Sequence, residues 1–321
     1  MSADPAVLDT FAADVVRDLQ RQPKQLQARY LYDPLGSSLF DAICRLPWYR
    51  ITRSEAMLLC RHARDIADRL SQRERDLSLV ELGCGNGEKL ELLVAAMPRQ
   101  SCAQVHLIDI SGEALKATTA RLSRFRQINV SAHQGTYEQG LASVRPFVQH
   151  HPGTLVVFLG SNIGNFDPSA ADAFLGAIRE PLARGSLFLL GADLVKPEKD
   201  LLLAYDDPLG VTAAFNKNLL VRLNRELDAD FDVAAFAHRA TWNARERRVE
   251  MHLVSTRDQH VYLAAADVRV SFAAGESIWT ESSYKYEPEA FAKRLRAAGF
   301  EPAAAWQDDD AGFLLTLTVA R

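Results

Sequence analysis

The sequence predicts an α/β protein with a doubly wound, seven-stranded domain and a second domain of α+β character. Three observations carry this prediction. Short apolar runs alternate with amphipathic helical patterns from residue 77 to residue 190, the alternation stops at Lys196, and it returns at Pro288. The chain has 321 residues, which fits two domains at about 150 residues each. We expect the first domain at 55–196 plus 286–321, and the second at 1–54 plus 197–285.

The N-terminal part of the chain is expected to be helical. Apolar residues recur at helical spacing over 5–22, 37–43 and 54–70. Ser54 stands where it can cap the third of these helices, and the acidic Glu55 falls in its first turn. The spacing therefore predicts three amphipathic helices before the first strand.

From residue 77 the pattern indicates a parallel sheet covered by helices on both faces. The expected strands lie at 77–82, 105–110, 130–137, 154–159 and 186–190. The expected helices between them lie at 88–97, 112–124 and 168–182. At the C-terminal end, a helix at 288–298, with Gly299 as its cap, precedes strands at 300–306 and 313–319.

Residues 197–285 interrupt this pattern. Helical stretches at 200–204 and 211–223 are followed by alternating, strand-like stretches at 248–255, 260–263 and 267–273. This order is typical of an α+β domain rather than of repeated βαβ units. We expect the insertion to pack with the N-terminal segment as a separate lobe, and a ligand to bind where the two domains meet.

Composition excludes several classes of protein. Hydrophobic residues make up 48% and charged residues 24%, as in ordinary globular proteins, so disordered and fibrous chains are excluded. The net charge of −4 gives no bulk attraction to phosphate backbones, so no nucleic-acid partner is expected. The histidines form no ligand cluster, and the acidic run 308–310 is interpreted as a solvated hairpin turn. No metal is expected.

The cysteines and the N-terminus indicate a cytoplasmic protein. No CxxC pair and no zinc-ligand spacing occurs among the four cysteines, Cys44, Cys60, Cys84 and Cys102. Free thiols fit a reducing compartment. The N-terminus lacks the apolar run of a signal peptide, and no run of 18 apolar residues occurs anywhere. We expect no membrane partner, and we expect the chain to act as a monomer.

A glycine loop joins the first expected strand to its helix. Residues 83–87 read Gly-Cys-Gly-Asn-Gly, a GxGxG pattern rather than the GxGxxG of dinucleotide binders. The alternative interpretation is a tight turn without a ligand. Asp109 ends the next strand, 26 residues after Gly83, where a carboxylate can accept from both hydroxyls of a ribose. The pattern favours a nucleoside cofactor without a pyrophosphate, namely S-adenosylmethionine. Glu81, just before the loop, has equally good structural and functional interpretations.

The C-terminal order supports the same cofactor. A helix followed by two strands with a short turn is the expected end of a seven-stranded methyltransferase sheet, whose last strand is antiparallel. NAD-dependent enzymes usually do not end in this way.

Several longer motifs resemble one family closely. The chain is similar to the histidine Nα-methyltransferases of ergothioneine biosynthesis over about residues 5–321. The motifs are LYDPLGSSLFDAICRLPWYRITRSE (31–55), VELGCGNGEKL (80–90), VVFLGSNIGNF (156–166), LLGADLVK (189–196), AYDDPLGVTAAFNKNLL (204–220), NRELDADFD (224–232) and TESSYKY (280–286). The resemblance implies a Rossmann-like methyltransferase domain beside a substrate-binding domain. It also implies trimethylation of L-histidine to hercynine by three molecules of S-adenosylmethionine, the first step towards ergothioneine.

The resemblance also implies site residues for the cofactor. The positions that match the family's cofactor residues are Tyr32, Gly83, Lys89, Asp109, Thr136 and Tyr137. Tyr32 corresponds to a tyrosine near the methionine end of the cofactor. Thr136-Tyr137 stands where the family usually has Asp-Phe beside the adenine, so this chain lacks a carboxylate there. We expect at most a modest loss of cofactor affinity from this departure.

The substrate residues fall into two groups by the same resemblance. Tyr49, Gly160, Asn165 and Tyr205 match residues that hold the backbone end of the amino acid. Met251, Glu281 and Ser283 match residues around its imidazole, with Ser282 between the last two. Tyr49 and Asn165 are the expected catalytic residues. Asn165 keeps the substrate in register, and Tyr49, or a water beside it, removes the proton.

Alternatives remain open at the level of sequence. Glu281 and Ser283 alternate along a strand, and without the resemblance a solvated face is the simpler interpretation. A relative that methylates another amino acid such as tryptophan is one alternative function. A non-catalytic S-adenosylmethionine-binding regulator is another.

Overall fold

The computed structural model describes residues 5–72, 74, 76–98 and 102–321, and these divide into two compact units. The sheet unit comprises Ile51–Val195 and Tyr284–Arg321, and the insert unit comprises Met1–Arg50 and Lys196–Ser283. These boundaries lie within a few residues of the expected domains. The first differs because one continuous helix begins at Ile51, three residues before the expected start, and belongs entirely to the sheet unit.

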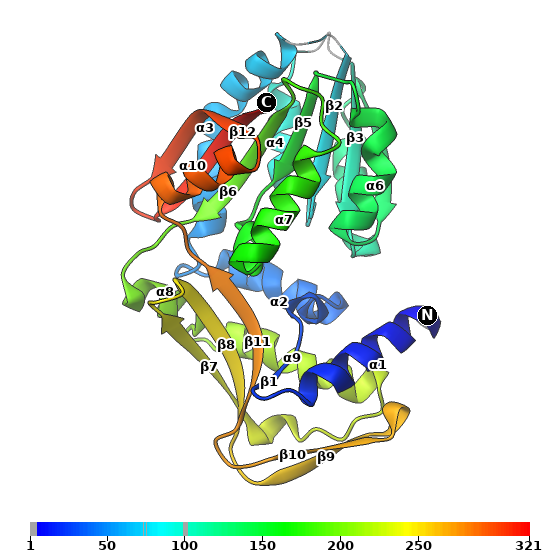
Figure 1. Ribbon diagram of the computed structural model, residues 1–321, viewed down its shortest axis with the longest axis vertical. Helices are drawn as coiled ribbons and strands as arrows, with labels where there is room; N and C mark the ends of the chain where they lie inside the picture. Colours follow the sequence, from blue (N-terminus) through cyan, green and yellow to red (C-terminus); the bar gives the residue numbers. More distant parts are fainter. Residues whose placement is uncertain (1–4, 73, 75, 99–101) are drawn as a thin grey trace. The chain divides into compact units, whose positions relative to one another are not determined.

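The sheet unit is built on a seven-stranded sheet of order β12-β13-β6-β5-β2-β3-β4 (Figure 1). Its strands are β2 (Asp76–Leu82), β3 (Cys102–Asp109), β4 (Ile128–Gln134), β5 (Thr154–Phe158), β6 (Leu187–Asp193), β12 (Phe300–Asp308) and β13 (Phe313–Ala320). The strands from β6 to β4 run parallel, whereas β13 is antiparallel to both β6 and β12. The predicted doubly wound α/β fold is confirmed.

Helices cover both faces of this sheet. On one face, visible in front in Figure 1, lie α6 (Tyr137–Val148), α7 (Pro168–Arg179) and α10 (Pro288–Ala297), which share an apolar core with β2, β5, β6 and β13. On the other face lie α3 (Ile51–Ser71), α4 (Glu88–Ala96) and α5 (Gly112–Leu122). The inner strands β5 and β6 are buried along their whole length and mostly apolar, because both of their faces are covered.

One expected strand is wrong at its end. The stretch 130–137 was predicted as a single strand, but β4 ends at Gln134 and α6 begins at Tyr137. Thr136 and Gln139 form a capping box, in which each side chain accepts from the other residue's backbone N–H. This local pairing starts a helix that the apolar pattern did not predict.

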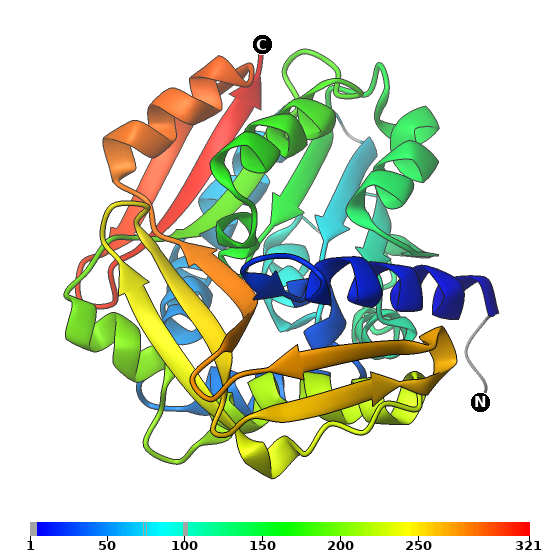
Figure 2. The same cartoon turned by 60° about the horizontal axis from the view of Figure 1, so that its bottom comes forward.

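The insert unit contains a four-stranded sheet of order β1-β11-β8-β7 and a separate β9–β10 hairpin. The strands are β1 (Lys24–Gln25), β7 (Phe236–Asn243), β8 (Arg248–Ser255), β9 (Gln259–Leu263), β10 (Val268–Phe272) and β11 (Ser277–Tyr284). The helices are α1 (Pro5–Leu19), α2 (Pro34–Arg45), α8 (Glu198–Tyr205) and α9 (Val211–Glu226), with single turns η1 (Ala28–Leu31), η3 (Val233–Ala235) and η4 (Ala264–Ala266). Figure 2 shows α1 beside the hairpin, where it contacts η4.

Several sequence features outside the site are also resolved. No helix in the described part of the chain combines the length and apolar character that a membrane crossing needs. Cys44, Cys60 and Cys84 are free thiols, and the side chain of Cys102 lies outside the described residues. The acidic run 308–310 lies in the turn between β12 and β13, where Asp308 accepts from the backbone N–H groups of Asp310 and Ala311.

Candidate active site

The glycine loop between β2 and α4 has the open backbone that a close ligand needs. Gly83, Gly85 and Gly87 have φ angles of 78°, 50° and 74°, all in the left-handed region that favours glycine. A Cβ at Gly87 would lie 2.7 Å from Thr118 Cγ2, so this position is closed by packing. A Cβ at Gly85 would meet nothing within 4 Å. The loop is therefore open at its middle, ahead of the N-terminus of α4.

Asp109 lies at the end of β3 beside this loop. Its carboxylate accepts from Ser111 N at 2.9 Å and from Gly85 N at 3.3 Å. Burial raises the pKa of Asp109, and these backbone hydrogen bonds oppose the rise. Each carboxylate oxygen has two acceptor positions, so Asp109 retains capacity for further donors. This capacity is what two ribose hydroxyls would use.

Tyr137 packs against the glycine loop, whereas Thr136 caps the N-terminus of α6. A Cβ at Gly83 would lie 3.0 Å from the Tyr137 hydroxyl, whose ring packs edge-on against Phe158. Burial raises the pKa of Tyr137, so its hydroxyl is neutral. The Thr136 hydroxyl accepts from Gln139 N at 3.4 Å as the cap of α6. A contact between Thr136 and the adenine stays a prediction.

A buried carboxylate that the sequence did not single out links two expected site residues. Glu55, on α3, forms an ion pair with Lys89 Nζ. Lys89 lies in the first turn of α4. Both oxygens of Glu55 also accept from Gly160 N, at 2.9 and 2.8 Å. Ser54 does not cap the helix, because α3 begins at Ile51; its hydroxyl is buried. The sequence indicated Glu55 only as a first-turn acid, and that is wrong because it is the fifth residue of α3. An acid in a helical pattern is usually solvent-exposed, so Glu55 was not predicted as a site residue.

Glu81 is a buried carboxyl group beside the glycine loop. It lies on β2 with 3% of its surface exposed, and its Oε2 has no hydrogen-bond partner among the described residues. Burial raises its pKa well above the usual value, and the charges of Asp109 and Glu55 add to this rise, while Lys89 opposes it. An orphaned carboxyl oxygen beside the glycine loop fits the α-ammonium group of S-adenosylmethionine.

Gly160 and Asn165 flank a single helical turn after β5. Gly160 and Ser161 both have positive φ angles, of 79° and 58°, which redirect the chain into η2 (Asn162–Asn165). Ser161 Oγ accepts from Asp193 N at 2.8 Å and fixes this turn to β6. Asn165 is exposed at the last position of η2, at the carboxyl end of the parallel strands. Ligands of doubly wound folds bind at this edge.

The insert unit brings together aromatic residues from distant parts of its chain. Tyr49 and Tyr205 lie edge to face, with ring centroids 6.2 Å apart. Tyr32 contacts Phe40 and Phe215 at 5.5 Å each, and Phe40 contacts Tyr49 at 6.2 Å. Phe40 and Phe215 were not predicted as site residues, although both stand inside quoted family motifs. These five rings are called the aromatic cluster below.

Tyr49 is a neutral hydroxyl rather than a ready base. It is 8% exposed, and burial raises the pKa of its hydroxyl well above the usual value. The neighbouring groups of Tyr205, Cys44, Tyr32 and Glu281 raise this pKa further. Tyr49 can therefore accept or donate a hydrogen bond at neutral pH, but it does not ionise there.

Polar groups of β11 border the aromatic cluster. The Tyr205 hydroxyl donates to Ser283 Oγ at 2.8 Å, and the charge of Glu281 acts on Tyr49. The structure thus brings together Tyr32, Tyr49, Tyr205, Glu281 and Ser283 within one unit. Met251 is buried on β8, where its carbonyl oxygen accepts from Thr280 Oγ1. Roles for Met251 and Ser282 stay predictions.

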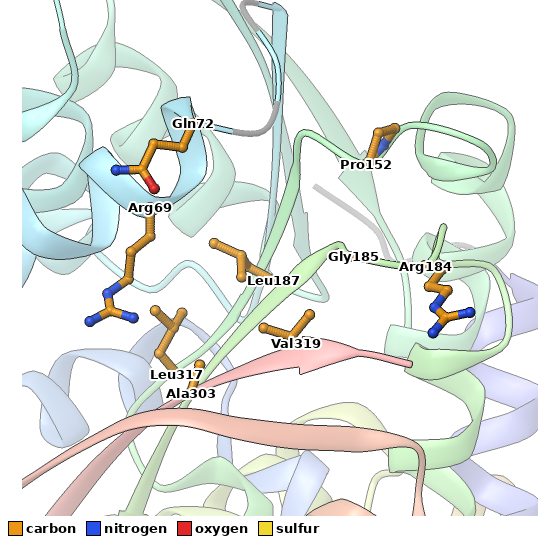
Figure 3. A pocket seen from close by; sticks show the side chains of 9 residues that line it. All are labelled: Arg69, Gln72, Pro152, Arg184, Gly185, Leu187, Ala303, Leu317 and Val319. Atoms are coloured by element: carbon orange, nitrogen blue, oxygen red, sulfur yellow. The ribbon is translucent and has the colours of Figure 1, made fainter.

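A cleft in the sheet unit lies away from all these residues. It is formed at the amino-terminal edge of the parallel strands, opposite the glycine loop (Figure 3). Leu187, Leu317 and Val319 form its floor, and Arg69 and Arg184 stand at opposite sides without converging. No expected site residue lines it. Among the described residues, no group of three His, Cys, Asp or Glu side chains is arranged to hold a metal ion.

The comparison with known families identifies the family of this chain. A family model described as histidine-specific methyltransferase, SAM-dependent, matches residues 11–320. The chain belongs to this family. The histidine-specific methyltransferase family is the one that the sequence motifs resembled, so that prediction is confirmed.

Curated relatives agree with this assignment. A histidine N-alpha-methyltransferase of Mycolicibacterium smegmatis is 40% identical, over 99% of this chain and 97% of the relative. A histidine N-alpha-methyltransferase of Mycobacterium tuberculosis is 41% identical, over 95% of this chain and 93% of the relative. Ergothioneine biosynthesis protein 1 of Neurospora crassa is 26% identical over 88% of this chain, but that match spans only 32% of the fungal protein.

Proposed function

We propose that the protein transfers methyl groups from S-adenosylmethionine to the α-amino nitrogen of L-histidine, three times in succession, to give hercynine for ergothioneine synthesis. The observation that carries the proposal is the match to the histidine-specific methyltransferase family over residues 11–320. Local geometry within each unit supports it: Asp109 lies beside the glycine loop in the sheet unit, and Ser283 accepts from Tyr205 in the insert unit.

The cofactor supplies an electrophilic methyl group on a sulfonium. We propose that Gly83 and Asp109 bind its nucleoside and that Lys89 binds its amino-acid end, with Tyr32 and Thr136-Tyr137 completing the site. Support comes from the open backbone at Gly85, the remaining acceptor capacity of Asp109 and the orphaned oxygen of Glu81. No strong catalytic base is needed for the transfer itself, because most of the gain comes from positioning.

The substrate residues are assigned by chemistry. Glu281 accepts from one imidazole N–H, and Ser283 binds the other ring nitrogen, with Met251 and Ser282 beside the ring. Asn165, Gly160 and Tyr205 hold the backbone end. The hydrogen bond from the Tyr205 hydroxyl to Ser283 Oγ supports this assignment, because it links the two groups of residues. A carboxylate left without a donor is costly, so side chains that lack an N–H there are rejected.

The amine must be unprotonated when it is methylated. Its unperturbed pKa is about 8 to 9, so a modest loss of solvation supplies the free form. Because the Tyr49 hydroxyl is neutral, we propose that Tyr49 orients the amine or a water that accepts the proton, rather than ionising itself. Asn165 keeps the amino acid in register as successive methyl groups change the shape of the nitrogen.

Two alternative functions are less well supported. A tryptophan methyltransferase gains nothing from paired Glu281 and Ser283, since an indole has one ring nitrogen, whereas an imidazole has two. A non-catalytic S-adenosylmethionine sensor does not need the tyrosine, serine and carboxylate groups that surround Tyr49.

We also propose a cytoplasmic, monomeric protein without a nucleic-acid partner. The net charge of −4 and the free thiols of Cys44, Cys60 and Cys84 support this.

The test is an incubation of the protein with S-adenosylmethionine and each standard amino acid, followed by mass spectrometry. We expect histidine alone to gain three methyl groups, and fragmentation should place all of them on the α-nitrogen. Methylation of a ring nitrogen, or preference for tryptophan, would contradict the proposal.

A further inference from the structure

Glu55 occupies a position that the sheet unit is built to hold. Its side chain is 0% exposed, and it reaches from α3 to residues on two other elements. Lys89, on α4, forms the ion pair, while Gly160, after β5, donates its N–H to both oxygens. One carboxylate thus contacts an expected cofactor residue and an expected substrate residue.

Strand β6 lacks a side chain where this carboxylate lies. A Cβ at Gly191 would lie 2.0 Å from Glu55 Oε1, far inside van der Waals contact. Because Glu55 is fully buried and held by two partners, its carboxylate has no free direction in which to retreat. The glycine is therefore required for the position of the acid.

Stability alone is a weak reason for such a pair. Glu55 is fully buried, whereas the Lys89 side chain is 23% exposed. Burying a charge costs several kcal/mol, and apolar replacements of buried pairs are often neutral or stabilising. The location of Lys89 adds to the cost, because it lies in the first turn of α4, where the helix dipole disfavours a cation. The Glu55 carboxylate offsets this cost. It therefore keeps the Lys89 ammonium group at the N-terminus of α4, beside the glycine loop.

We propose that Glu55 is a positioning residue, whose carboxylate aims Lys89 Nζ at the amino-acid carboxylate of the cofactor and fixes the Gly160 turn that leads to Asn165. The inference rests on the proposed function. The same Lys89 lowers the pKa of Glu81, whose orphaned oxygen lies beside the loop. Glu55, Lys89 and Glu81 together would match a zwitterionic amino-acid group.

The first test is the Glu55→Gln variant, which keeps the shape and one acceptor for Gly160 N–H but removes the charge. We expect the affinity for S-adenosylmethionine, measured by calorimetry, to fall about 10- to 100-fold, as for loss of a charged hydrogen bond. The KM for the cofactor should rise by a similar factor, while kcat should fall less than tenfold. Glu55→Asp should recover part of the affinity.

Gly191→Ala is the second test and leaves Glu55 in the sequence. Because the new methyl group displaces the carboxylate, it should weaken cofactor binding in the same direction. If Glu55→Gln fails to fold, the cofactor affinity of Gly191→Ala still tests the proposal. In a Lys89→Met background, Glu55→Gln should cost no further cofactor affinity, because its effect passes through Lys89.

Asp193→Asn is the matched control. Asp193 and Lys285 form another ion pair in the same unit, with side chains 3% and 0% exposed. This variant should lose thermal stability while its cofactor affinity stays within about twofold, since it leaves the Glu55–Lys89 pair intact. If Glu55→Gln and Gly191→Ala bind the cofactor as tightly as wild type, the positioning role is wrong. If wild type itself does not bind S-adenosylmethionine, the proposed function fails instead.

Discussion

The two units build their functional residues from opposite chemistries. In the sheet unit, the candidate site residues are charged groups and bare backbone: the buried Glu55 and Glu81 and the partly buried Asp109 and Lys89, around a loop of left-handed glycines. In the insert unit they are neutral hydroxyls among aromatic rings, with Glu281 as the charged member. The difference follows from the proposed ligands, because a charged cofactor needs countercharges, whereas a substrate nitrogen that changes its methylation state needs replaceable contacts.

The largest expected effect is a loss of discrimination for histidine on substitution of Glu281, with no change in cofactor affinity. Glu281→Ala should reduce discrimination for histidine over other amino acids by about 2–4 kcal/mol, because the imidazole loses a charged acceptor. Cofactor affinity should not change, since the cofactor residues lie mostly in the other unit. Competition assays with amino-acid mixtures measure the first quantity and calorimetry measures the second. Glu246→Ala, whose side chain is exposed at 44% in the same unit, serves as the control; equal discrimination in the two variants would remove Glu281 from the site.

The converse change is at Asp109. Asp109→Ala should weaken S-adenosylmethionine binding by about 1.5–3 kcal/mol, or about 10- to 150-fold, because hydrogen bonds to a carboxylate are lost. Calorimetry on the folded variant checks this, with Asp172→Ala as a control, since the Asp172 side chain is 61% exposed on α7. Unchanged affinity would exclude Asp109 from the cofactor site, and binding of NAD in place of S-adenosylmethionine would contradict the assignment as a whole.

The smallest expected effect concerns a neutral hydrogen bond. Tyr205→Phe removes the hydroxyl that donates to Ser283 Oγ, which is worth about 0.5–1.5 kcal/mol. The KM for histidine should rise about 2- to 10-fold while cofactor affinity stays constant. Tyr262→Phe removes the hydroxyl that donates to Asp267 on the exposed hairpin and should change neither constant. A change in cofactor affinity with Tyr205→Phe would contradict the assignment of Tyr205 to the substrate rather than to the cofactor.

The same contrast explains what the sequence could predict. In the sheet unit, apolar strands alternate with helices along the chain, so β2, β3, β5 and β6 were predicted nearly at their observed bounds. The glycine loop and Asp109 follow from spacing alone. Helix α6 was missed because a capping box at Thr136, rather than apolar periodicity, sets its start. Strand β7 of the insert unit was missed, and β11 was indicated only by the alternation of Glu281 and Ser283, since the pairing of these strands is not visible along the chain.

Site residues outside the glycine loop could not be derived from local pattern. Tyr49, Tyr205 and Ser283 meet through tertiary packing, so only the family resemblance pointed to them. Glu55 escaped both approaches, because an acid on an amphipathic helix is ordinarily solvated. Its inward orientation depends on Gly191, a residue 136 positions later.

The place of β13 in the sheet has a consequence for biosynthesis. This strand lies between β6 and β12, yet it is translated last, and its partner β6 emerges more than a hundred residues earlier. Until then β6 presents an apolar, unpaired backbone edge of the kind that promotes aggregation. Such long-range pairing also slows folding, since the intervening loop must close first. The sheet unit is therefore completed only after translation of β13, and until then the edge of β6 is open to pairing with other strands.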